Sequence, residues 1–170
     1  YLGQSSIPVD GVKKAVHASR IMYNASRFLI GASTHTIDEA LNAEKDDADF
    51  ITFGPVYETP SKMKYGKPVG LEALKEAVKK VSFPIFAIGG IKVENIDVVV
   101  KTGASGVALI SGILGSSNIK NAVKNYLKVL FLLFFLYLLF HLRPKIGYDL
   151  ILIVDDMKLQ NDVLRCEYVE

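Results

Sequence analysis

The sequence contains little that would support a secreted or a nucleic-acid-binding protein. Its single cysteine, Cys166, excludes an intramolecular disulfide and is typical of the reducing cytoplasm. The net charge is only +2 and no Lys/Arg-rich patch is present, which argues against nucleic acid as a partner. Half of the residues are hydrophobic and 22% are charged, so the chain also falls outside the disordered class. We therefore expect a folded cytoplasmic protein.

The start of the chain also lacks the features of a secretory signal peptide. The first residue is Tyr1 rather than methionine, and neither a basic nor an apolar segment follows it. We expect the beginning of the domain to be missing from this sequence.

Short apolar runs alternate with amphipathic stretches over most of the chain. The runs begin at Phe28, Phe50, Pro84 and Gly106 and are apolar almost throughout, as in strands buried on both faces of a parallel sheet. Helical spacing is found between them, at residues 36–45, 71–80, 93–101 and 117–127, with an earlier helix expected at 9–23. Repeated strand–helix units predict an α/β fold with right-handed crossovers.

Ligands of parallel α/β folds bind where the strands end, so the residues after each run are the candidates for chemistry. These positions hold Ser33, the long loop from Gly54 to Lys62, the Gly89-Gly90 pair, and Ser111-Gly112. Glycine lets backbone amides approach a phosphate closely, and the following helix adds positive partial charge. Two such turns on successive units favour a phosphate site over ordinary turns.

The loop after the second run combines the hydroxyls of Thr59 and Ser61 with the ammonium group of Lys62. This combination suits a phosphate or pyrophosphate. His35 could act as a base, but we favour a structural role for it, and Asp38 and Glu39 are typical of the first turn of a helix. The sequence shows no zinc-ligand spacing and no Ser-His-Asp or Cys-His arrangement.

Four motifs, in this order, closely resemble those of thiamine-phosphate synthases: Gly31-Ala-Ser-Thr-His-Thr, Asp49-Phe-Ile-Thr-Phe-Gly-Pro-Val-Tyr-Glu-Thr-Pro-Ser-Lys, Ala87-Ile-Gly-Gly-Ile and Gly106-Val-Ala-Leu-Ile-Ser-Gly-Ile. The resemblance runs from Tyr1 to about Leu127, and Leu2-Gly3-Gln4 resembles the end of the fourth barrel strand. It implies a partial (β/α)₈ TIM barrel, from the end of strand four through strand eight. A complete barrel needs about 200 to 250 residues, so the first three strands are expected to be absent.

The resemblance also implies a reaction and a set of site residues. The family is a cytoplasmic transferase of thiamine biosynthesis, which joins hydroxymethylpyrimidine diphosphate to hydroxyethylthiazole phosphate and releases pyrophosphate. By position, Ser33 and Lys62 would contact the pyrimidine diphosphate and act in catalysis. The residues that would hold the thiazole phosphate are Thr59, Pro60, Ser61, Gly90, Ile110 and Ser111.

Magnesium is the cofactor that the resemblance implies, but the ligand set is incomplete in this chain. Where the family has an aspartate that binds Mg²⁺, this sequence has Ser6, a poor ligand for a hard dication.

Two alternatives to thiamine-phosphate synthesis remain open. The chain could be a thiazole tautomerase of the same superfamily, although that branch has a histidine where this chain has Pro55. It could instead be an inactive, truncated phosphate-binding half barrel, with a tendency to form homo-oligomers.

The character of the chain changes after Lys128. Residues 129–142 are almost entirely Leu and Phe; as a helix they would span about 21 Å, short of the roughly 30 Å of a bilayer core. A membrane segment through 126–142 is therefore the less favoured interpretation. Farther on, Leu150-Ile-Leu-Ile-Val-Asp-Asp resembles the start of a response-regulator receiver domain, with Asp155 and Asp156 as the acidic pair. We divide the chain into a barrel part (1–128), a hydrophobic segment (129–143) and a receiver-like tail (144–170).

Overall fold

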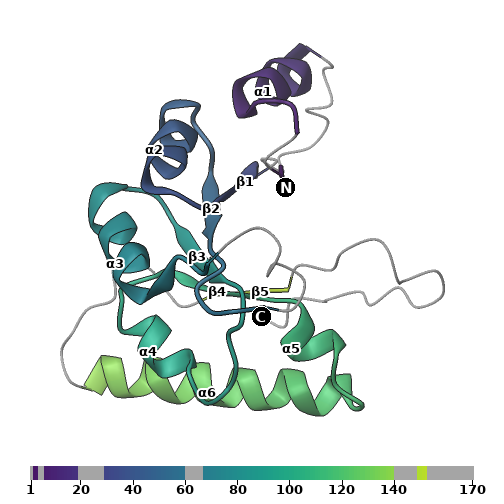
Figure 1. The fold of residues 1–170 in the computed structure, drawn as a ribbon. Coiled ribbons are helices and arrows are strands. Elements are labelled where there is room, and N and C mark those ends of the chain that lie inside the picture. The colour runs from purple at the N-terminus through teal and green to yellow at the C-terminus, as the bar shows by residue number, and fades with distance from the viewer. Residues whose placement is uncertain (1, 4–5, 19–28, 60–66, 140–148, 153–170) are drawn as a thin grey trace.

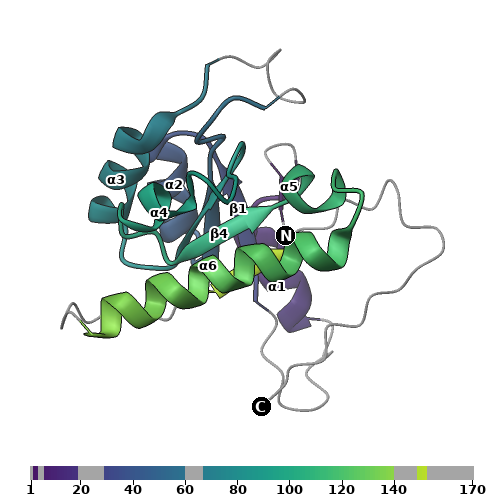
Figure 2. The same ribbon diagram turned by 90° about the horizontal axis from the view of Figure 1, so that it is seen from below.

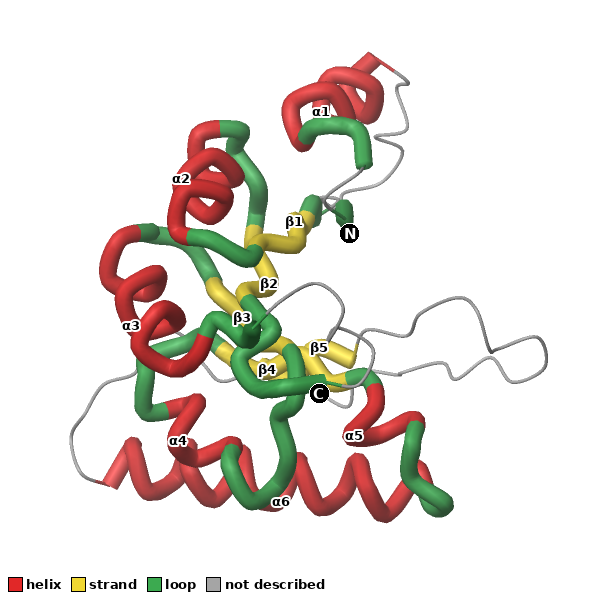
Figure 3. The backbone as a smooth tube through the Cα atoms, viewed as in Figure 1, coloured by secondary structure: helices red, strands yellow, loops and turns green. Residues whose placement is uncertain are grey.

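The structure, a computed structural model, describes residues 2–3, 6–18, 29–59, 67–139 and 149–152. Five parallel strands form one sheet in the order in which they occur along the chain. They are β1 (Gly31–Thr34), β2 (Phe50–Phe53), β3 (Ile85–Ile88), β4 (Gly106–Leu109) and β5 (Asp149–Leu152). The strands follow one another in a curved row (Figure 3). This arrangement confirms the predicted α/β class with a parallel sheet.

Six helices accompany the sheet within the described residues. They are α1 (Val9–Ala18), α2 (Ile37–Lys45), α3 (Gly70–Lys80), α4 (Ile96–Val100), α5 (Ser111–Leu114) and α6 (Ile119–Leu139). Helices α2, α3 and α4 lie along one side of the curved sheet, and α6 runs below α4 and α5 (Figure 1). Seen from below, α6 lies in front of the sheet (Figure 2).

The apolar runs form strands because both of their faces are covered. All four residues of β4 are buried, and Ile51 and Phe53 of β2 are fully buried. Phe50 and Phe86 meet edge to face, with ring centroids 5.7 Å apart. All four predicted strands are confirmed. The strands in the runs that begin at Phe50, Pro84 and Gly106 end earlier than those runs, because the glycines and hydroxyl residues that follow leave the ladder and form turns.

The sheet continues past β1 through the start of the chain. Leu2 forms an isolated parallel bridge with Ala32. Its N–H donates to Gly31 O at 2.8 Å, and the N–H of Ser33 donates to Leu2 O at 2.9 Å. A strand end is therefore present at Leu2, the first residue of the Leu2-Gly3-Gln4 motif.

Helix α2 shows how local sequence sets an element boundary. Thr36 is the N-cap, and its hydroxyl accepts the N–H of Glu39 at 3.1 Å, a bond typical of threonine at this position. The Glu39 carboxylate accepts the N–H of His35 at 2.7 Å. Ala40 and Ala43 are buried on the inner face of the helix.

The end of the chain carries the last helix and the last strand of the structure. Helix α6 runs without a break through residue 128, where we placed a domain boundary, because apolar residues extend the pattern begun at Ile119. Residues 149–152 of the tail pair with β4, from Gly106↔Asp149 to Leu109↔Leu152. Asp155 and Asp156 lie outside the described residues, so the receiver resemblance stays a prediction. Among the described residues, no helix is long and apolar enough to cross a membrane.

Glu44 forms pH-dependent hydrogen bonds that connect α2 with the turn before β3. Its Oε1 accepts the Ser82 hydroxyl at 2.6 Å and the Ser82 N–H at 2.8 Å. These bonds, the hydroxyl first, lower the pKa of Glu44. A lowered pKa means stability that is present above the unfolded-state value and lost as pH falls through the folded-state value. Glu44→Gln should therefore reduce the unfolding free energy by about 1 kcal/mol at pH 7, a modest value because solvent reaches the pair.

Urea denaturation at pH 7 and at pH 3.5 checks this prediction. The difference between wild type and Glu44→Gln should largely disappear at the lower pH. Glu76→Gln is the matched control, because Glu76 pairs with the exposed Lys80 on its own helix and the substitution should change stability by less than about 0.5 kcal/mol. An equal effect of Glu44→Gln at both pH values would contradict the assignment.

Candidate phosphate-binding site

The carboxyl ends of the strands meet at one edge of the sheet and are tied together by backbone hydrogen bonds. The N–H of Gly54, just after β2, donates to Thr34 O at the end of β1 at 3.2 Å. The N–H groups of Val56 and Tyr57 donate to Ile88 O and Gly89 O, at 2.9 and 3.0 Å. The loop after β2 is therefore seated against the turn after β3, as expected for a site built from several strand ends.

The glycine pair after β3 adopts a conformation that favours glycine. Gly89 and Gly90 have φ values of +96° and +65°. A Cβ on Gly90 would lie 2.6 Å from Tyr57 Cβ and 2.8 Å from Glu58 O. These glycines are required by both backbone geometry and space, which gives them a physical role beyond an ordinary turn.

The turn after β4 leads directly into α5. Ile110 is the N-cap of this short helix, and its carbonyl accepts the N–H groups of Ile113 and Leu114 at 3.1 and 2.8 Å. The first N–H groups of a helix have no partner within the helix. Ile110 and Ser111, both predicted site residues, thus begin a helix at the carboxyl edge of the sheet.

Thr59 stands out in the loop after β2, because its Oγ1 is buried and has no hydrogen-bond partner within the described part of the chain. A buried hydroxyl without a partner carries an energetic cost that a bound oxyanion would remove. Three other predicted residues of this loop, Pro60, Ser61 and Lys62, lie outside the described residues. Their roles stay predictions.

Ser33 lies on β1 beside Thr52 of β2 and is partly accessible. Its neighbour Thr34 is buried and donates its hydroxyl to Thr52 O at 3.0 Å. Ser33 is therefore held at the same edge as the glycine turns by a well-bonded pair of strands. Its contact with a substrate stays a prediction.

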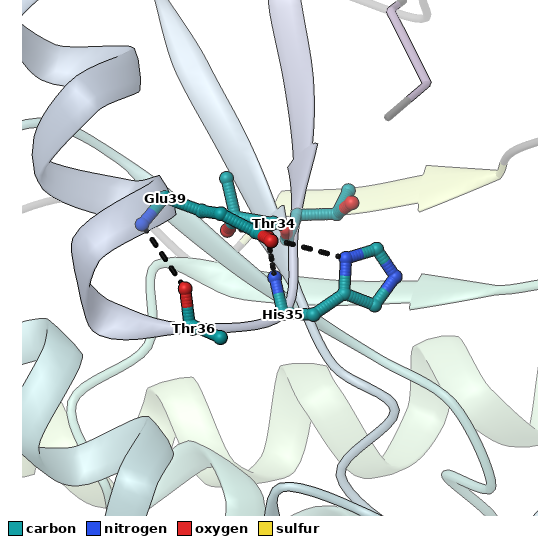
Figure 4. Close-up of polar contacts among 5 residues, drawn as sticks. Thr34, His35, Thr36 and Glu39 are labelled. Atoms are coloured by element: carbon teal, nitrogen blue, oxygen red, sulfur yellow. Dashed lines mark hydrogen bonds and ion pairs between the residues drawn. The ribbon is translucent and has the colours of Figure 1, made fainter. Parts of the chain in front are cut away.

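His35 has a structural environment, in line with the role we favoured. Glu39 Oε2 accepts the His35 backbone N–H and also lies 3.4 Å from the ring Nδ1 (Figure 4). The N-cap itself is Thr36, and His35 immediately precedes it. The Glu39 carboxylate thus fixes the turn between β1 and α2, with the imidazole beside it.

Two residues that the sequence did not single out bear on the site. Asn95 accepts the Lys92 N–H at 2.8 Å and donates to Gly90 O at 3.1 Å. Tyr126 of α6 donates its hydroxyl to Ile91 O at 3.3 Å. An open pocket of about 380 Å³ is lined in part by Gly112 and Tyr126, and its lining contains none of the residues to which the resemblance assigns a ligand.

The described residues do not form a metal centre, because they contain no group of three His, Cys, Asp or Glu side chains that could hold an ion. Ser6 stands where the resemblance places a metal-binding aspartate, and its Oγ accepts the Gly3 N–H at 3.0 Å. A hydroxyl already engaged with the backbone does not supply the charged oxygen that Mg²⁺ prefers. The residues present therefore do not fit the ion.

These features define a class: a parallel α/β protein whose strand ends form a candidate phosphate site. The particular family follows from the sequence of residues 1–113, which match the family described as thiamine monophosphate synthase. The chain belongs to this family. Thiamine-phosphate synthases from Methanocella arvoryzae and Pelotomaculum thermopropionicum are 38% and 40% identical to it, over 74% and 73% of this chain and 55% and 53% of their own length.

Solved structures agree with this assignment. A thiamine phosphate pyrophosphorylase from Pyrococcus furiosus superposes with a TM-score of 0.67 at 32% identity, covering 78% of this chain and 58% of that one. A structure described as native KDPGal shares the fold alone, with a TM-score of 0.50 at 18% identity over 75% of this chain and 58% of that one. The chain spans a little over half the length of the curated relatives that it matches.

Proposed function

We propose that the chain takes part in thiamine-phosphate synthesis, coupling hydroxymethylpyrimidine diphosphate to hydroxyethylthiazole phosphate with release of pyrophosphate. The observation that carries the proposal is the pairing of two backbone turns at neighbouring strand ends, Gly89-Gly90 and Ile110-Ser111, in a member of this family. The turns supply N–H groups for a phosphate. The Thr59 hydroxyl, which is buried and has no hydrogen-bond partner among the described residues, supports an anion at the same edge.

We also propose which strands of the barrel this chain contains. Leu2 would be the end of the fourth barrel strand, and β1 to β4 would be strands five to eight. This numbering agrees with the bridge from Leu2 to Ala32 and with the strand order of the sheet. In a complete barrel the eighth strand pairs with the first, and here β5 occupies that side of β4.

The proposed chemistry is dissociative. Pyrophosphate leaves the pyrimidine, and the thiazole nitrogen captures the resulting methylene cation. Such a reaction needs stabilisation of the charge on the leaving group and exclusion of water more than it needs a general base. Lys62 and Ser33 would bind the diphosphate. The thiazole phosphate would be bound by Thr59, Pro60, Ser61, Gly90, Ile110 and Ser111.

The tautomerase is the alternative within the same superfamily, and Pro55 argues against it. At this position the tautomerase branch has a histidine, whereas Pro55 has no group that transfers a proton. The proline also leaves no room for another side chain at Gly89, because a Cβ there would lie 2.5 Å from Pro55 Cβ. We therefore favour coupling over tautomerisation.

The test of the proposed function is formation of thiamine phosphate from both substrates in the presence of Mg²⁺. Lys62→Ala should reduce kcat/KM by about 100-fold or more, the scale seen when one stabilising group is removed from a developing anion. Lys64→Ala, two residues farther along the sequence, should keep kcat/KM within about threefold of wild type. Conversion of the non-aromatic thiazole phosphate without any coupling would favour the tautomerase.

We also propose that the chain acts in the cytoplasm and that its ligands are small-molecule substrates. We further propose that the chain self-associates. Self-association is supported by apolar side chains that α6 leaves exposed, among them Phe131 and Leu132. Sedimentation velocity would separate a monomer from a homo-oligomer.

A further inference from the structure

Tyr126 connects the two turns of the candidate site. It lies on α6, is only 4% exposed, and donates its hydroxyl to Ile91 O at 3.3 Å across 35 residues of sequence. Ile91 directly follows the Gly89-Gly90 pair. A buried side chain from a distant helix therefore contacts the backbone of the turn after β3.

The same hydroxyl is packed against the turn after β4. A Cβ on Gly112, the residue after Ser111, would lie 2.5 Å from Tyr126 Oη and 3.3 Å from Cζ. The hydroxyl group is thus wedged between the Ile91 carbonyl and the Gly112 backbone. Burial, with a smaller contribution from the Glu94 carboxylate, raises the pKa of Tyr126, so the hydroxyl keeps its proton and remains a donor at neutral pH.

Each of the three consecutive carbonyl groups of the turn after β3 has a protein donor. The bonds are Tyr57 N–H to Gly89 O at 3.0 Å, Asn95 Nδ2 to Gly90 O at 3.1 Å, and Tyr126 Oη to Ile91 O at 3.3 Å. In a trans peptide the N–H points away from the carbonyl, so the bonds to Gly89 O and Gly90 O fix the direction of the N–H groups of Gly90 and Ile91. The bond from Tyr126 fixes the next peptide, whose N–H belongs to Lys92 and donates to Asn95 Oδ1. A turn that binds an anion needs this arrangement, because a carbonyl facing a phosphate would repel it.

We propose that Tyr126 and Asn95 are positioning residues for the substrate phosphate. Asn95 orients the Ile91 N–H through its bond to Gly90 O, and Tyr126 holds the end of the turn after β3 and sets its spacing from the turn after β4. The proposal rests on the function proposed above. Neither side chain is assigned a contact with the ligand. Both act through the backbone that would hold it.

Tyr126→Phe tests the proposal while keeping the buried ring. Loss of the bond should raise the Kd for hydroxyethylthiazole phosphate, and its KM, by about 5- to 10-fold, with KM for the pyrimidine diphosphate changed less than twofold. Thr102→Val is the matched control. It removes a 2.7 Å bond from a hydroxyl to the Val99 carbonyl at the end of α4, with a similar loss of stability. Its Kd should stay within twofold of wild type.

A double-mutant cycle directly tests the packing of Tyr126 Oη against the Gly112 backbone. Gly112→Ala should weaken binding of the thiazole phosphate strongly in the wild-type background, because the new Cβ meets Tyr126 Oη. In the Tyr126→Phe background that atom is gone, so the same substitution should cost at least threefold less in Kd. Additive effects of the two substitutions on Kd would contradict the contact between Tyr126 Oη and the Gly112 backbone.

A ligand-free measurement separates failure of this proposal from failure of the proposed function. In ¹H–¹⁵N spectra of the free chain, Tyr126→Phe should move the cross-peaks of Gly90, Ile91 and Gly112, whereas Thr102→Val should leave them in place. If wild type binds no thiazole phosphate, the proposed function fails, and these shifts alone decide whether Tyr126 sets the turns. Unmoved cross-peaks, or a Kd within twofold of a wild type that does bind, would overturn the proposal.

Discussion

Replacing Gly54 by alanine is expected to destabilise the chain strongly, by forcing apart the ends of two neighbouring strands. A Cβ at this position would lie 2.0 Å from the carbonyl oxygen of Ile88 and 2.9 Å from its carbonyl carbon. These are backbone atoms of the neighbouring strand, so no side-chain rotation relieves the clash. The ends of β2 and β3 would have to separate, with loss of the bond between Val56 N–H and Ile88 O.

We expect Gly54→Ala to lower the unfolding free energy by about 3 kcal/mol or more, a large part of the stability of a small domain. Urea denaturation followed by circular dichroism measures the change. Gly3→Ala is the control, because the nearest atom to its Cβ would be Ser6 Oγ at 3.7 Å, an ordinary contact. A Gly54→Ala chain as stable as Gly3→Ala would contradict the packing of these two strand ends.

Gly90→Ala is expected to have the second large effect, on binding rather than on folding. Its φ of +65° disfavours any other residue, and the Cβ would press on Tyr57 and Glu58 in the loop after β2. Either the turn or the loop must move, and both carry predicted phosphate contacts. A displacement of about 1 Å in a preorganised site lowers the reaction rate by on the order of 100-fold.

We therefore expect Gly90→Ala to reduce kcat/KM for hydroxyethylthiazole phosphate by about 100-fold. The control is Gly103→Ala, which has a φ of +91° and a Cβ contact of 3.2 Å with Val78, at the opposite end of α4 from Gly90. Both variants carry the cost of a left-handed alanine, but only Gly90→Ala alters the site. Equal kinetics for the two variants would refute a phosphate role for the turn after β3.

The sheet and its outer helices could be predicted from the sequence because the signals are local. A run such as Ile85–Ile88 is apolar on both faces, which is typical of a buried parallel strand. Thr36, with Glu39 three residues later, marks the start of α2. The glycine turns were also predictable, since Gly89-Gly90 follows a strand directly. Local signals are weaker at helix ends. The stretch predicted as a helix from residue 93 begins only at Ile96, because Asn95 ties residues 90–92 into a turn first.

The connections between distant segments could not be predicted. Tyr126 looks like an ordinary core residue in the helical pattern, and only the fold places its hydroxyl at Ile91 O. Pairing of β5 with β4 is likewise a long-range event, which no local pattern around Asp149 encodes. The sequence identified which residues could bind a phosphate. It did not identify the residues that hold those turns in place.

Thiamine phosphate formation by this chain tests the central claim most directly. With both substrates and Mg²⁺, ³¹P NMR should show equal amounts of thiamine phosphate and pyrophosphate, formed well above the enzyme-free rate and abolished by heat denaturation. Absence of product, together with no saturable binding of hydroxyethylthiazole phosphate, would contradict the proposed function of the strand-end site.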